Sequence, residues 1–166
     1  TIVSGGDREL IAFSADQKTV TSLLIKGNFP PVKRLFPETV ENYAVMNTAE
    51  LIESTRRVQL VLERDAALRY SFGDDGLTLE AIGSENAQAS ETIDAHVTGG
   101  DTTVSLKPQF LIDGLSAVHS EFVRIGFTKT DNPNKPGPVL ITSQSSKDQP
   151  GTDNYRYLLQ PNLLLR

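Results

Sequence analysis

Apolar and polar residues alternate along the start of the chain with the period of two that is typical of β-strands. Residues 1–3, 10–13 and 19–25 are expected to be strands, and Ser4-Gly-Gly-Asp7 between the first two is a tight-turn sequence. The segment Gly27-Asn-Phe-Pro-Pro31 breaks the pattern and is expected to be a connector. Three strands without a helix supply little core, so this part is not expected to fold alone.

A helical period of apolar residues follows further along the chain. Residues 43–46 predict a short strand, and Asn47 is expected to cap a helix that runs to about Leu62, with Glu50 as its capping-box partner. The apolar stripe of this helix consists of Leu51, Ile52, Thr55, Val58 and Leu62. Strands are expected at 68–72, 77–82 and 91–97, with a hairpin sequence at 73–76.

The same order of elements then repeats. Residues 103–106 predict a strand, and Pro108 suits the first position of a helix that runs to about Val118. The stripe of this second helix consists of Phe110, Leu111, Leu115 and Val118. Gly114 is expected to weaken the helix by about 1 kcal/mol relative to alanine. Strands are expected at 122–127, 139–143 and 155–159, separated by loops at 128–137 and 144–153.

Residues 40–160 therefore read as strand–helix–three strands, twice, with a period of roughly 60 residues. The two halves share this order of elements but not their sequences. The order predicts an α+β fold in which the two helices pack on one face of a mainly antiparallel sheet.

Composition limits the class of protein. The 166 residues suggest one domain, or one domain with a fragment of another, and the absence of cysteine excludes disulfides and thiolate chemistry and fits a cytoplasmic location. No apolar run approaches the ~18 residues of a membrane span, and no signal-peptide pattern is present. The net charge of −5 argues against a simple basic DNA binder, but it is compatible with a protein that encloses DNA and has an acidic exterior. Because Thr1 is not a methionine and opens a strand, we expect a C-terminal part of a longer protein.

No group of residues has the spacing of a catalytic, cofactor or metal site. His96 and His119 lie far apart without a carboxylate ligand pattern, and residues 114–118 lack the second glycine of a nucleophile elbow. Asp74-Asp75 is expected to be a hairpin tip, and residues 131–137 lack the spacing of an EF-hand. We therefore expect a binding or scaffolding protein that is not an enzyme and has no cofactor and no metal.

Two segments resemble a known family. Gly27-Asn-Phe-Pro-Pro-Val-Lys-Arg-Leu-Phe-Pro37 resembles the linker before the third domain of the bacterial DNA polymerase sliding clamp, the beta subunit of DNA polymerase III, although Val32 stands where an aromatic residue is usual. Tyr157-Leu-Leu-Gln-Pro161 resembles the closing Tyr-x-x-Met-Pro segment of that family. The resemblance implies the DNA clamp fold, with the end of the middle clamp domain and the linker in residues 1–31 and the third clamp domain in residues 32–166.

The resemblance also implies a function without catalysis. In this family two three-domain subunits close head to tail into a ring around duplex DNA, which they do not read by sequence, and the ring tethers the DNA polymerase III catalytic subunit. The clamp loader and other proteins with clamp-binding motifs are further implied partners, and no membrane is. The fragment itself is not expected to close a ring. The alternative is a β-rich ligand-binding module unrelated to replication, for which the absence of tryptophan removes the usual sugar platform.

The residues implied for a hydrophobic peptide-binding pocket lie in the linker and near the C-terminus. They are Pro30, Arg34, Leu35, Pro138, Leu158, Leu159, Gln160, Pro161, Asn162 and Leu163. An apolar cleft with a polar rim suits a peptide with Leu and Phe anchors. Alternatively, Leu158 and Leu159 are ordinary core and edge residues of a last strand. Gln160 stands in place of the usual methionine, so a more polar pocket is expected.

Two further sets follow from the same resemblance. Arg56, Arg57 and Arg64 lie on or just after the first helix, away from its apolar stripe, and are expected to meet DNA phosphates or to form a solvated face. The dimer interface of the ring corresponds to Leu60, Val61, Glu85 and Glu91, which are otherwise ordinary edge residues.

Overall fold

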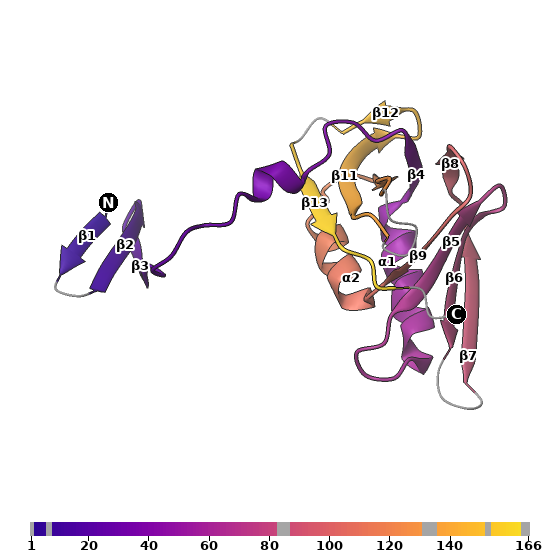
Figure 1. Cartoon of the computed structure of the whole chain (residues 1–166), viewed down its shortest axis with the longest axis horizontal. Helices are drawn as coiled ribbons and strands as arrows, with labels where there is room; N and C mark the ends of the chain where they lie inside the picture. The colour runs from indigo at the N-terminus through magenta and orange to yellow at the C-terminus, as the bar shows by residue number, and fades with distance from the viewer. Residues whose placement is uncertain (1, 6–7, 83–86, 131–135, 152–153, 164–166) are drawn as a thin grey trace. The chain divides into compact units, whose positions relative to one another are not determined.

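The computed structural model describes residues 2–5, 8–82, 87–130, 136–151 and 154–163 (Figure 1). The chain divides into two compact units, Thr1–Leu35 and Phe36–Arg166, which are described separately. This division falls a few residues after the domain boundary expected at residue 31.

The first unit is a small antiparallel sheet, as its alternating pattern predicts. Its strands are β1 (Ile2–Gly5), β2 (Arg8–Ala15) and β3 (Lys18–Leu23), and they lie in the order β1-β2-β3. Phe13 pairs with Val20 across β2 and β3, yet both side chains are more than 60% exposed within the described structure. The sheet therefore buries little apolar surface of its own. A short 3₁₀-helix, η1 (Val32–Leu35), follows and was not predicted.

The second unit confirms the doubled order of elements. Its first half consists of β4 (Asn42–Asn47), α1 (Thr48–Val58), the 3₁₀-helix η2 (Gln59–Val61), β5 (Leu68–Gly73), β6 (Gly76–Ile82), β7 (Gln88–Ile93) and the short β8 (His96–Thr98). Its second half consists of β9 (Thr102–Leu106), α2 (Pro108–Ser116), β10 (Phe122–Phe127), β11 (Val139–Ser146), β12 (Gln149–Pro150) and β13 (Arg156–Leu159).

The described strands of this unit form two antiparallel sheets, whereas the sequence predicted one. The first has the order β12-β11-β10-β4-β8, with β13 also beside β11, and the second has the order β7-β6-β5-β9. The first strand of each half joins the sheet of the other half, because β4 pairs with β10 and β9 pairs with β5. The two halves are therefore interlocked and do not form separate layers.

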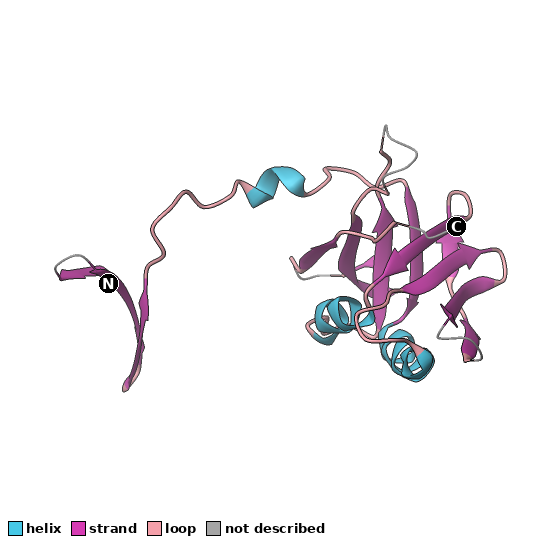
Figure 2. Cartoon of the chain, turned by 60° about the horizontal axis from the view of Figure 1, so that its bottom comes forward, coloured by secondary structure: helices cyan, strands magenta, loops and turns pink. Residues whose placement is uncertain are grey.

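The two α-helices lie side by side against the strands (Figure 2). Asn47 caps α1 as predicted, since its Oδ1 accepts a hydrogen bond of 3.0 Å from the backbone N–H of Glu50. Leu51, Leu111 and Leu115 of the predicted stripes are fully buried. Phe110 is an exception at 50% exposure, and Ile112 is buried in the same helix. None of the described helices is long and apolar enough to cross a membrane.

Two strand predictions were wrong in detail. The strand expected at 91–97 is divided at Asp94 and Ala95, because β7 pairs with β6 while β8 pairs with β4 of the other sheet. The alternation of side chains continues through this change of sheet, so the sequence pattern does not reveal it. The unpredicted β12 lies within the expected loop 144–153.

A single core links both sheets and both helices. The rings of Phe72 on β5 and Phe127 on β10 have centroids 4.8 Å apart and connect the two sheets. On α2, a Cβ atom added to Gly114 would lie 2.7 Å from Cδ1 of Tyr157, and the Tyr155 hydroxyl donates a hydrogen bond of 2.6 Å to the Gly114 carbonyl. Burial raises the pKa of both tyrosines. Gly114 therefore provides the space in which β13 packs against α2.

Candidate functional site

The C-terminal segment links the two sheets of the second unit. Leu159 lies opposite Val139 in the last pair between β13 and β11, and the strand ends there, as the proline two residues on predicts. Pro161 is buried, and the backbone N–H of Asn162 then donates a hydrogen bond of 2.8 Å to the carbonyl of Ser105 on β9. This last contact was not predicted. It holds the end of the described chain against an edge strand of the second sheet.

The pocket residues of the second unit differ in their exposure. Leu159 points into the core and is 7% exposed, as the alternative interpretation of that residue has it. Leu158 points to the opposite face of β13 and is half-buried, and Pro138 is also half-buried. Leu163 is 61% exposed. A partly exposed apolar strip therefore runs along the terminal segment, with the exposed polar residues Gln160 and Asn162 beside it.

Gln160 makes a specific contact. Its Nε2 donates a hydrogen bond of 2.8 Å to the carbonyl of Pro136, in the segment that leads into β11. The Thr128 hydroxyl donates a hydrogen bond of 2.6 Å to the carbonyl of Pro138 in the same segment.

The three remaining pocket residues lie in the first unit. Pro30 is exposed in the connector, and Arg34 and Leu35 belong to η1, where Leu35 is 64% exposed. Their contribution to one pocket with the terminal segment stays a prediction.

Sequence reasoning missed Arg156 as a residue next to this strip. The Arg156 guanidinium donates a hydrogen bond of 2.8 Å to the carbonyl of Pro37 and lies 4.9 Å from the centroid of the Phe36 ring. All three residues belong to the second unit. The start of that unit is thus attached to β13, the strand that precedes the terminal segment. No sequence signal points to this contact, which joins residues more than a hundred positions apart.

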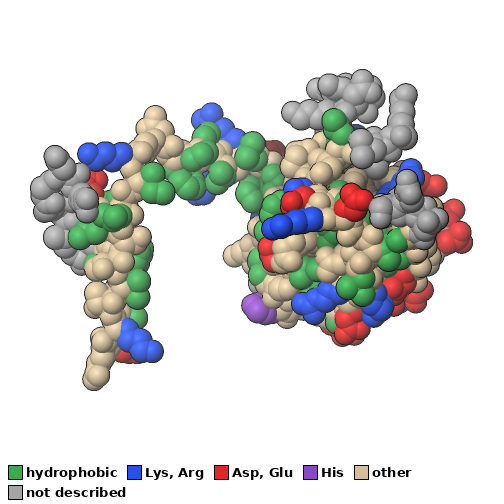
Figure 3. Space-filling model, turned by 90° about the horizontal axis from the view of Figure 1, so that it is seen from below, with side chains coloured by type: hydrophobic (Ala, Val, Ile, Leu, Met, Phe, Trp, Pro, Cys, Tyr) green, Lys and Arg blue, Asp and Glu red, His purple; other side chains and the backbone are tan. Residues whose placement is uncertain are grey.

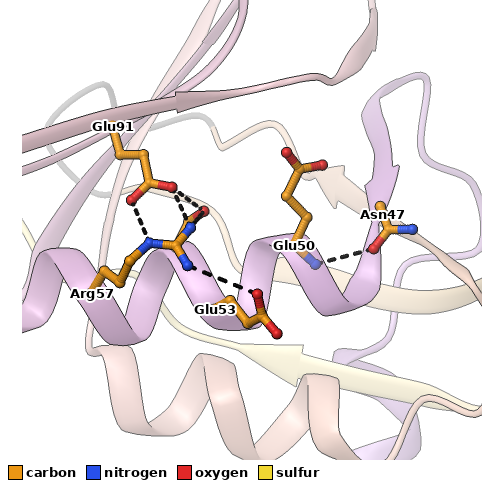
Figure 4. Close-up of polar contacts among 6 residues, drawn as sticks. Asn47, Glu50, Glu53, Arg57 and Glu91 are labelled. Atoms are coloured by element: carbon orange, nitrogen blue, oxygen red, sulfur yellow. Dashed lines mark hydrogen bonds and ion pairs between the residues drawn. The ribbon is translucent and has the colours of Figure 1, made fainter.

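The residues proposed to face DNA do not behave alike. Nε and Nη2 of Arg57 donate hydrogen bonds to the carboxylate of Glu91 on β7, and Ser54 donates a hydrogen bond of 2.7 Å to the same carboxylate (Figure 4). Glu53 lies one helical turn before Arg57 and forms a longer ion pair of 3.8 Å with it. The hydrogen bonds from Arg57 and then Ser54 hold the pKa of Glu91 below its usual value. Arg57 and Glu91, which the sequence assigned to two different surfaces, therefore form one cluster between α1 and β7.

Arg56 and Arg64 are exposed and form no ion pair with any residue that the structure describes. On the face of the second unit shown in Figure 3, basic and acidic side chains lie interspersed and do not form a continuous basic surface.

A family model described as the DNA polymerase III beta subunit, C-terminal domain, matches residues 33–148. The chain belongs to the DNA polymerase III beta subunit family. It is 37% identical over 158 residues to the beta sliding clamp of Streptomyces coelicolor, covering 95% of this chain and 41% of that protein. It is 28% identical over 160 residues to the beta sliding clamp homolog GriR of Streptomyces muensis, covering 96% of this chain and 42% of that protein. The chain thus spans about two fifths of the length of these relatives.

Solved sliding clamps share the fold. The clamp of Pseudomonas aeruginosa bound to griselimycin matches with a TM-score of 0.79 at 21% identity, over 98% of this chain and 41% of that one. The beta subunit of Streptococcus pyogenes matches with the same TM-score at 22% identity, over 98% of this chain and 42% of that one. The clamp fold that the family resemblance implied is therefore confirmed.

The residues expected at the ring interface of this beta subunit chain also lie in different environments. Leu60 on η2 is 81% exposed, whereas Val61 beside it packs against the core. Glu91 is held by Arg57, and Glu85 lies outside the described residues. Among the described residues of this set, Leu60 is the exposed apolar one, and its place in an interface stays a prediction.

A cavity of about 410 Å³ lies elsewhere in the clamp domain. It is lined by the end of β4, the start of α1 and the β5–β6 hairpin, and Asp74, Asp75, Asp94 and His96 are among its lining residues. Among the described residues no three His, Asp or Glu side chains are placed to hold a metal ion.

Proposed function

We propose that this chain is part of a processivity factor, a protein that encircles duplex DNA as a ring dimer and tethers the replicative polymerase. The match of the family model to residues 33–148 carries this proposal. The identity of 37% to a beta sliding clamp over 95% of the chain supports it. The protein acts by topology and binding, without a catalytic step. A β-rich ligand-binding module unrelated to replication gains no support from these relatives.

The partners bind through the terminal segment. Leu158, Pro138 and Leu163 offer apolar contact to the anchors of a short linear motif, and the exposed polar residues supply the rim. The occupants are the DNA polymerase III catalytic subunit, the clamp loader and other proteins that carry clamp-binding motifs.

DNA binding within the ring is non-specific. Arg56 and Arg64 are available for phosphate contacts, while Arg57 is engaged with Glu91. Contacts of this kind weaken as salt concentration rises, because they release counterions. They suit a ring that slides.

A peptide-binding measurement on the full-length protein tests the pocket. A fluorescent peptide of the form Gln-Leu-x-Leu-Phe is expected to bind in the micromolar range, and Leu158→Asp is expected to weaken binding at least tenfold, because a buried charge replaces an apolar contact. Gln149→Ala, at an exposed position on β12, is the control and should leave affinity unchanged. Absence of binding at high micromolar peptide would remove the pocket assignment.

A further inference from the structure

Three prolines interrupt backbone pairing at one end of the strip. Beyond the last pair of β11 and β13, Val139 with Leu159, the next positions along the two strands are Pro138 and Gln160. Pro136, Pro138 and Pro161 have no N–H group, so these three positions cannot donate backbone hydrogen bonds to the neighbouring strand. The carbonyl groups of Pro136 and Pro138 lie beyond the last backbone pair of β11 and β13, so they need donors from elsewhere.

Side chains supply these donors. Gln160 Nε2 donates to the Pro136 carbonyl at 2.8 Å, and Thr128 Oγ1 donates to the Pro138 carbonyl at 2.6 Å. Gly137, between the two prolines, lies so close to the carbonyl of Thr128 that a Cβ atom there would clash with backbone. The segment 136–138 is thus held on both sides, and Gln160 extends the contact between β11 and β13 past the point where the backbone can do so.

This contact also fixes the orientation of the Gln160 amide. A carbonyl oxygen only accepts hydrogen bonds, so the nitrogen of the amide faces Pro136 and its oxygen, Oε1, faces away. Oε1 accepts no hydrogen bond from the residues that the structure describes, and the residue is exposed. A held, solvent-accessible acceptor therefore lies two residues along the chain from Leu158. An acceptor held in place loses less entropy on binding than a mobile one.

We propose that Gln160 is a specificity-determining residue of the peptide pocket. Its fixed Oε1 selects peptides that carry an amide or hydroxyl donor beside their apolar anchors. A methionine, the residue that the family resemblance leads one to expect here, offers only a weak acceptor and adapts to many apolar ligands. This inference rests on the proposed function, because it assigns a preference to the same pocket.

The test is a double-mutant cycle between protein and peptide. Short peptides with the same Leu and Phe anchors carry a single Gln at each non-anchor position in turn, and a matched set carries Met there, which has a similar length and no N–H. Their affinities are measured on the full-length protein and on Gln160→Met by fluorescence anisotropy. In the wild-type protein one position should favour Gln over Met by about 2- to 10-fold, the value of one hydrogen bond. Gln160→Met should abolish that preference.

Gln149→Met makes the same substitution at an exposed position of β12 and should retain the preference. Thermal unfolding of Gln160→Met checks that the variant is folded. An equal preference in the wild type and in Gln160→Met would overturn this proposal alone, as would the absence of any preference in the wild type. Failure of every peptide to bind both proteins would overturn the pocket itself and this proposal with it.

Discussion

For Gly114, helix propensity and the packing seen in the structure predict opposite effects of an alanine substitution. On helix propensity alone, Gly114→Ala should stabilise α2 by about 1 kcal/mol. In the structure the new methyl group would meet the ring of Tyr157 at 2.7 Å, where the backbone and the ring are both packed. Overpacking of this kind destabilises by about 1–3 kcal/mol, so we expect a net decrease in the free energy of unfolding.

Chemical denaturation followed by circular dichroism measures this effect. Gly100→Ala is the matched control, because no atom lies within 4 Å of a Cβ added there. It should leave stability unchanged or raise it slightly. A Gly114→Ala variant more stable than the wild type would contradict this prediction, because it would show that Tyr157 moves aside without lowering the free energy of unfolding.

The ion pair of Glu91 makes a second prediction at the residue scale. Because Arg57 and Ser54 lower the pKa of Glu91, the folded state favours the carboxylate. The resulting stability is fully present above the usual glutamate pKa of about 4.3 and is lost as the pH falls through the lower pKa of the folded state. Glu91→Gln should lower Tm by about 4 °C or less at neutral pH, since the pair is partly exposed.

The pH dependence distinguishes this cause from packing. The difference in Tm between wild type and Glu91→Gln should shrink as the pH is lowered below 4. At neutral pH, added salt should also reduce this difference, because salt screens the attraction between partly exposed charges. Glu63→Gln, at an exposed position, should show neither trend. A difference that stays constant with pH would point to packing of the side chain.

Sequence patterns predicted the capping of α1 by Asn47 but not the partner of Arg57. A cap involves residues three positions apart, so local sequence contains both groups. Arg57 and Glu91 are 34 positions apart and meet only because β7 lies beside α1. Gln160 is similar: the sequence marked it as unusual, but its contact with Pro136 depends on how β11 and β13 pair.

At the scale of elements, periodicity predicted nearly all strands and both helices of the second unit. It could not separate β7 from β8, because the alternation of side chains is the same whether a strand stays in one sheet or crosses to another. Periodicity also could not show that β4 and β9 exchange between the halves, because the order of elements along the chain does not specify which strands pair.

The attachment of the start of the second unit to β13 is a property of elements that can be tested. Arg156→Ala removes the hydrogen bond to the Pro37 carbonyl and the contact with the Phe36 ring. Loss of a hydrogen bond from a charged donor should loosen the segment by roughly 1 kcal/mol, which corresponds to several-fold faster hydrogen exchange of the backbone amides of residues 38–41.

Arg156→Lys should give most of the same effect, because a lysine lacks the planar guanidinium that stacks on an aromatic ring. Arg69→Ala, at an exposed position on β5, is the control and should leave these amides unchanged. Unaltered exchange in Arg156→Ala would mean that the segment is held by other contacts.

At the scale of the whole molecule, the shared core of the interlocked halves determines the fold, whereas the exposed Leu60 concerns association with a second subunit. Because β4 and β9 exchange between the halves, the two halves of the second unit share a single core. Leu60 lies outside that core at 81% exposure, while its neighbour Val61 packs against it. A substitution at Leu60 should therefore affect association without affecting the fold.

In the full-length protein, Leu60→Glu should convert a dimer into monomers, because a charge replaces apolar surface at the proposed ring interface and must be desolvated there. Light scattering measures the mass, and thermal unfolding should show a folded monomer. Phe110→Glu changes another exposed apolar residue, on α2, and should leave the dimer intact. Val61→Glu should instead lower the stability of the monomer, because that side chain contacts the core. A Leu60→Glu protein that remains dimeric at micromolar concentration would place the interface elsewhere on the domain.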